Sequence, residues 1–66
     1  MKSIYDIQQM LKQFGTIIYV GDRIADLELM EEEVRELYKE RFITSEQFQM
    51  ALLLIRQEIN ITKKTR

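Results

Sequence analysis

Three segments of the chain place apolar residues at steps of three and four, the spacing of an amphipathic helix. The first runs from Ile4 to Phe14, the second from Arg23 to Arg41 and the third from about Ser45 to Ile59. At about 100° per residue, these apolar positions fall on one face of each helix. They are Ile4, Ile7, Met10, Leu11 and Phe14 in the first segment; Ile24, Leu27, Met30, Val34, Leu37 and Tyr38 in the second; and Phe48, Ala51, Leu52, Ile55 and Ile59 in the third. The pattern predicts a small all-α three-helix bundle, with the second and third helices as an antiparallel hairpin and the first packed across them.

Local signals mark where these helices begin and end. Ser3 and Asp22 are residues that favour the N-cap position. Thr44 followed by Gln47 has the spacing of a capping box, which predicts the start of the third helix. Gly15 follows the first helix and supplies the left-handed conformation that ends many helices.

The segment between the first two helices reads FGTIIYVGDR, residues 14–23, and resembles a strand. A lone strand in a small helical domain would leave its backbone groups unpaired, and the chain has no second strand candidate. We therefore expect an extended apolar connector in which alternate residues, either Ile17 and Tyr19 or Ile18 and Val20, plug one end of the bundle. The remaining alternative is that residues 16–20 pair with the same segment of another chain.

Three stretches carry a resemblance to a known family. IYVGDR at residues 18–23 leads into DLELMEEE at residues 26–33, and LYKERFITSEQF at residues 37–48 follows as a helical hairpin. In this order they resemble the YqgQ-like family of small bacterial proteins over nearly the whole chain. The resemblance implies a three-helix fold and suggests, as a function, binding to single-stranded nucleic acid.

Length and charge limit what the protein does. The chain has 66 residues, enough for one helical domain, residues 1–66, with a small core. Its last residues, 61–66, include Lys63, Lys64 and Arg66, and we expect them to form a frayed basic tail. The net charge is −1, so any binding to nucleic acid needs a local basic patch rather than a strongly basic surface.

The composition also argues against an enzyme. The chain has no His and no Cys, so it lacks the usual general base, thiolate nucleophile and soft metal ligands. Glu31, Glu32 and Glu33 are consecutive, so on a helix their carboxylates diverge and belong to a solvated face. We expect no catalytic residue, cofactor or metal. Without a long apolar span or an export leader, we expect a soluble cytoplasmic protein that does not enter membranes.

Cations close to aromatic rings are the candidates for contact with nucleic acid. Aromatic rings stack on bases while cations meet phosphates, and this combination holds single strands without reading their sequence. The candidates are Tyr5, Lys12, Tyr19, Arg23, Lys39 and Arg41. Such neighbours are also ordinary surface residues, and whether they meet depends on how the first helix crosses the hairpin.

Apolar residues outside the predicted core faces are the candidates for contact with protein. They are Leu29, Met50, Leu53 and Leu54. A wide apolar face on the third helix could absorb Leu54 and Met50, and a single exposed leucine such as Leu29 is normal. Leu53 is the hardest to accommodate in the core. The sequence thus leaves two functions open: a non-enzymatic module that binds single-stranded nucleic acid, or a module that associates with itself or with another protein.

Overall fold

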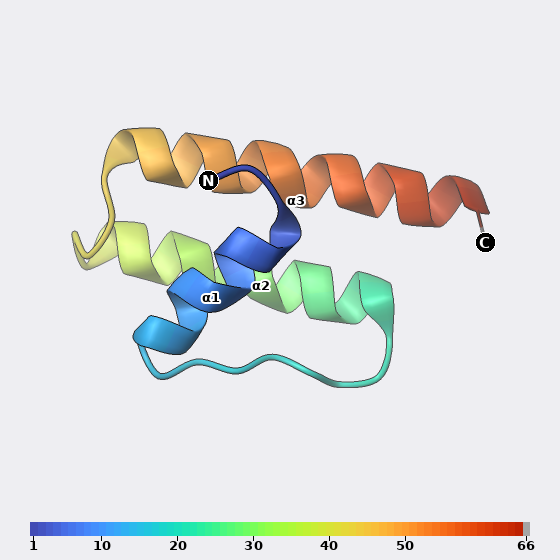
Figure 1. Ribbon diagram of the computed structural model, residues 1–66, viewed down its shortest axis with the longest axis horizontal. Helices are drawn as coiled ribbons and strands as arrows, with labels where there is room; N and C mark the ends of the chain where they lie inside the picture. The colour runs from blue at the N-terminus through green and yellow to red at the C-terminus, as the bar shows by residue number, and fades with distance from the viewer. Residues whose placement is uncertain (66) are drawn as a thin grey trace.

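The protein is a bundle of three helices. The computed structural model describes the backbone of residues 1–65 and the side chains of residues 1–64. The elements are α1 (Ile4–Gln13), α2 (Arg23–Lys39) and α3 (Ser45–Thr65), and residues 1–65 contain no strand. Figure 1 shows α2 and α3 side by side and antiparallel, with α1 across them and a drawn-out connector between α1 and α2. The predicted all-α architecture is confirmed.

The helices begin where side chains satisfy their first amides. Asp22 accepts a hydrogen bond from the amide of Ala25 at 3.3 Å. Thr44 Oγ1 accepts from the amide of Gln47 at 3.1 Å, and Gln47 Oε1 accepts from the amide of Thr44 at 2.8 Å, which is a complete capping box. Ser3 occupies the N-cap position of α1, but its side chain makes no capping hydrogen bond.

Two helices end in the same motif. At the end of α1, the amide of Thr16 donates to the carbonyl of Leu11 at 2.9 Å and Gly15 has a φ of 85°. At the end of α2, the amide of Phe42 donates to the carbonyl of Leu37 at 2.9 Å and Arg41 has a φ of 63°. Both are Schellman motifs, in which a left-handed residue follows the helix. Our predicted end of α2 at Arg41 is therefore wrong, because Arg41 turns the chain out of the helix after Lys39.

α3 is longer than its apolar pattern predicts. It continues beyond Ile59 to Thr65, so the segment expected to be a frayed tail is helical as far as Thr65, and Arg66 lies outside the described residues. Lys63 and Lys64 lie in its last turn, where cations interact favourably with the negative end of the helix dipole. No helix within residues 1–65 is both long enough and apolar enough to cross a membrane.

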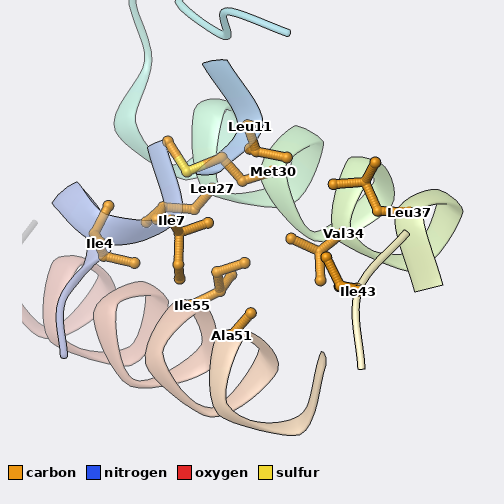
Figure 2. Packing of buried hydrophobic residues seen from close by; sticks show 10 residues of the cluster. All are labelled: Ile4, Ile7, Leu11, Leu27, Met30, Val34, Leu37, Ile43, Ala51 and Ile55. Carbon is orange, nitrogen blue, oxygen red and sulfur yellow. The ribbon is translucent and has the colours of Figure 1, made fainter. Parts of the chain in front are cut away.

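The core lies where the three helices meet. Ile7, Leu27, Val34, Ala51 and Ile55 are completely buried. The whole cluster, drawn in Figure 2, consists of Ile4, Ile7, Leu11, Leu27, Met30, Val34, Leu37, Ile43, Ala51 and Ile55. Ile43 comes from the loop between α2 and α3, and the others belong to the predicted apolar faces.

Two aromatic residues of the predicted core lie at its rim instead. Phe14 is 42% exposed because it follows the last turn of α1, and its ring packs on that of Phe42 with 5.6 Å between the ring centroids. Tyr38 is 39% exposed, and its ring stacks on that of Phe48 with 4.2 Å between centroids. These two ring pairs join the last turns of α1 and α2 to the α2–α3 loop and the first turn of α3.

Candidate functional site

The connector, residues 16–20, is held at both ends. Its first residue, Thr16, belongs to the Schellman motif that ends α1. Near its other end, the amide of Val20 donates to Oδ1 of Asp26 at 2.7 Å. Gly21, with a φ of 89°, then turns the chain into the N-cap residue Asp22. These contacts fix the path of the connector along α2, which Figure 1 shows below the hairpin.

Asp26 is a buried charged residue with a positional role. Its exposure is only 8%, and it lies in the first turns of α2. Burying a carboxylate is unfavourable unless hydrogen bonds replace its water, and the amide of Val20 supplies one. Asp26 was not among the candidate residues predicted from the sequence. A signal was present, because Asp26 lies four residues before the core residue Met30 and so shares its side of the helix.

Of the connector side chains at residues 17–20, one faces the core and three face solvent. Ile18 is partly buried and packs against the core, whereas Ile17 is 79%, Tyr19 82% and Val20 59% exposed. The prediction that Ile17 and Tyr19, or Ile18 and Val20, pack as a pair is therefore wrong. Ile18 enters alone, because the chain is tied to Asp26 through the Val20 amide and turns away at Gly21 immediately afterwards.

The backbone of the connector is open between its two anchors. Among the described residues, the amides of Ile17, Ile18 and Tyr19 have no hydrogen-bond partner. The exposure of successive side chains alternates from Ile17 to Tyr19, as in an extended chain, where successive amides point to opposite edges. The segment thus combines exposed apolar side chains with unpaired backbone donors, the two features that a strand of another protein recognises.

A groove of about 240 Å³ separates the connector from α1. Its lining includes the polar side chains Gln8, Gln9 and Lys12 from α1 and the apolar side chains Leu11, Ile18 and Met30. Thr16 and Ile17 of the connector complete it. An apolar groove with a few polar groups on one side can accept a side chain of a partner that lies along the connector.

The six candidate nucleic-acid residues are spread over the molecule. Arg23 and Lys39 are the first and last residues of α2, about 24 Å apart at 1.5 Å per residue. Tyr19 lies close to Arg23 in the chain, Arg41 lies beyond Lys39, Lys12 borders the groove, and Tyr5, 64% exposed, lies near the start of α1. The structure therefore does not bring the six into one patch.

Several cations are already engaged by acids. Arg23 forms an ion pair with Glu58 at 3.3 Å, across from α2 to α3. Glu31 pairs with Arg35 at 3.2 Å, as the spacing predicts, and with Arg56 of α3 at 3.7 Å. No cluster of three carboxylates among the described residues is arranged to hold a metal ion. The pairs Arg23–Glu58 and Arg56–Glu31 join α2 to α3 at the protein surface, whereas Arg35–Glu31 lies within α2.

The four candidate interface residues differ in how far they are buried. Leu54 is partly buried and packs against the core, so the core accounts for it. Met50 is 41% and Leu53 51% exposed on α3, whereas Leu29 is 37% exposed on α2. Met50 and Leu53 are neighbours three residues apart on one helix face, and Leu29 belongs to a different helix.

Comparison with known proteins gives one consistent result. A family model described as YqgQ-like matches residues 1–61. A relative from Bacillus subtilis strain 168, described as an uncharacterized protein YqgQ, is 44% identical over 66 residues. The alignment covers all of this chain and 93% of that relative. The similarity therefore includes α1, α2, the connector and nearly the whole of α3.

Proposed function

The chain belongs to the YqgQ-like family, and on that premise we propose that it is a non-enzymatic protein-interaction module whose connector docks another protein. The observation that carries this proposal is the exposure of Ile17 and Tyr19, at 79% and 82%, on a segment anchored at both ends. The proposal that it is not an enzyme draws support from a sequence without His or Cys.

The exposed side chains supply the driving force for binding. Burial of a large apolar side chain contributes about 1.5–3 kcal/mol relative to leaving it in water. Ile17 and Tyr19 are the most exposed large apolar side chains of the described residues, and Val20 adds a third at 59%. Because they neighbour one another in the chain, one partner segment can cover all three.

The anchors supply preorganisation. A connector that is already held in place loses less conformational entropy on binding than a free loop does. The hydrogen bond from Val20 to Asp26 and the hydrogen bond from Thr16 to Leu11 provide these anchors. A partner with an extended segment would pair with the open amides of the connector, and the groove beside Lys12 would receive one of its side chains.

The positions of the cations give less support to binding of single-stranded nucleic acid. Arg23 and Lys39 lie at opposite ends of α2, and Arg23 is paired with Glu58. A short single strand bound by phosphate contacts needs cations along one continuous groove. We therefore favour a protein partner and treat nucleic acid as an outcome that the experiment must be able to detect.

The proposal is tested by affinity capture from cytoplasm with the full chain and with the double variant Ile17→Ser, Tyr19→Ser. We expect the wild type to retain a protein that the double variant does not. The variant should unfold at an unchanged urea midpoint, since both side chains are exposed. Equal capture by both forms, or capture of RNA alone, would overturn the proposal.

A matched control keeps the comparison specific to the connector. Tyr5 is 64% exposed on α1, so Tyr5→Ser removes an exposed tyrosine elsewhere in the protein. Capture should be unaffected by this substitution. Loss of capture in Tyr5→Ser as well would show that general surface apolarity, rather than the connector, is responsible.

A further inference from the structure

The outer face of α3 carries a stripe that is not used by the core. We define the α3 stripe as Met50, Leu53, Gln57 and Ile61, with Glu46 and Lys64 at its two ends. At 100° per residue, these six positions lie within about 80° of one another. Leu53 points away from Ala51 and Ile55, the two completely buried residues of α3.

The apolar members of the stripe are accessible. Met50 is 41%, Leu53 51% and Ile61 56% exposed. Met50 and Leu53 are three residues apart, and Leu53 and Ile61 are eight apart with Gln57 midway between them, so the stripe as a whole keeps the steps of three and four that form a seam between two helices. A helix that were simply solvated on this side would not need three large apolar residues along it.

The α3 stripe is complementary to itself when a second copy runs in the opposite direction. Glu46 and Lys64 lie equally far from position 55, on opposite sides of it, and so do Leu53 and Gln57. A two-fold axis at position 55 therefore sets Glu46 against Lys64 of the other copy at both ends. Among the described residues, neither Glu46 nor Lys64 forms an ion pair within its own chain.

We propose that α3 pairs antiparallel with α3 of a second copy of this chain along the α3 stripe. A two-fold pairing uses the same patch on both copies, and opposite charges at its ends favour the antiparallel over the parallel direction. Three half-exposed apolar side chains per copy make a small interface, below the standard size of about 1,600 Å². The dimer is accordingly reversible, and each copy keeps its connector free.

Charge reversal distinguishes this arrangement from other forms of self-association. In the proposed register, Glu46→Lys sets two lysines against each other at both ends of the dimer, and Lys64→Glu sets two glutamates against each other. The double variant Glu46→Lys, Lys64→Glu restores opposite charges at both ends. A purely structural role of these exposed residues would not produce such a rescue.

The experiment is sedimentation equilibrium of the purified full chain at low ionic strength and tens of micromolar protein. The wild type should exceed its monomer mass of 8.0 kDa. Each single reversal should weaken dimerisation several-fold, Leu53→Asp should abolish it, and the double reversal should restore it. The control Leu29→Asp, on α2, should leave the mass unchanged.

Three results would overturn the proposal. The first is a wild-type monomer throughout the concentration range, and the second is a double reversal that stays as weak as the singles. The third is a dimer that is lost in the connector variant Ile17→Ser, Tyr19→Ser, since the α3 stripe does not include the connector. Failure here leaves the proposed function untouched, because that function depends on the connector alone.

Discussion

The buried carboxylate of Asp26 accepts a hydrogen bond of 2.7 Å from the backbone amide of Val20, which precedes it by six residues. This contact ties the connector to the first turns of α2 and determines which connector side chains face solvent. In our account Asp26 is therefore a positioning residue for a docking segment. The buried carboxylate sets the path of the connector, whereas the exposed side chains of Ile17, Tyr19 and Val20 make the proposed contacts with a partner.

Removal of the Asp26 carboxylate should loosen the connector. Asp26→Ala leaves the amide of Val20 without its partner, so we expect a loss of about 1.5–3 kcal/mol in the free energy of unfolding. Amide exchange at Val20 should accelerate more than exchange in the core of α2. Asp26→Asn keeps an acceptor oxygen and should lose less. Unchanged exchange at Val20 in Asp26→Ala, followed by NMR, would contradict this role.

Gly15 after α1 and Arg41 after α2 both have a left-handed backbone, and substitutions at the two positions should change the stability in opposite directions. Arg41 holds a φ of 63°, a conformation that disfavours residues with a Cβ by about 1–2 kcal/mol. Arg41→Gly should therefore raise the melting temperature by several degrees. Gly15→Ala should lower it, although no atom lies within 4 Å of the added methyl group. Calorimetry that finds shifts of the same sign for both variants would refute this interpretation.

Substitutions at Ile7 and Ile17 compare the contribution of a core side chain to stability with that of an exposed connector side chain. Ile7 is completely buried, so Ile7→Val should cost about 0.5–1.5 kcal/mol and Ile7→Ala about 2–5 kcal/mol. Ile17 is 79% exposed, so Ile17→Val should change the free energy of unfolding by less than about 0.5 kcal/mol. Urea denaturation measures both. An equal loss from Ile7→Val and Ile17→Val would mean that the Ile17 side chain is packed in the fold rather than free in solvent.

Binding of single-stranded nucleic acid should be weak and nonspecific. Because Arg23 and Lys39 lie at opposite ends of α2, we expect no saturable binding of a labelled oligonucleotide at about 0.15 M salt. Fluorescence anisotropy over a salt series makes this measurement. Saturable binding that falls with salt, and that Lys12→Glu or Arg23→Glu weakens, would favour the nucleic-acid function instead.

Local features of the fold could be predicted from the sequence. The capping box of Thr44 and Gln47 and the stop at Gly15 depend on neighbouring residues, and both are present. The end of α2 could not be located, because Arg41 has no intrinsic preference for the left-handed conformation that it adopts. The additional turns of α3 contain one apolar residue, Ile61, which is exposed and does not continue the core face, so the core pattern does not reveal them.

The candidate site was only partly predictable. The connector was expected to be extended and apolar, but the separate roles of Ile18 and Val20 depend on a contact with α2. Asp26 shows the same difficulty, since its partner is a backbone amide that every residue except proline carries. The separation of Arg23 from Lys39 follows from helix length, whereas the positions of Lys12 and Tyr5 depend on how α1 crosses the hairpin.

Photo-crosslinking in cells tests whether the connector docks another protein. A benzoylphenylalanine in place of Tyr19 should form a protein adduct that protease removes and nuclease does not. The same group in place of Tyr5, which is 64% exposed on α1, should form little or none. Equal adducts at both positions, no adduct at Tyr19, or a nuclease-sensitive adduct there would contradict the account.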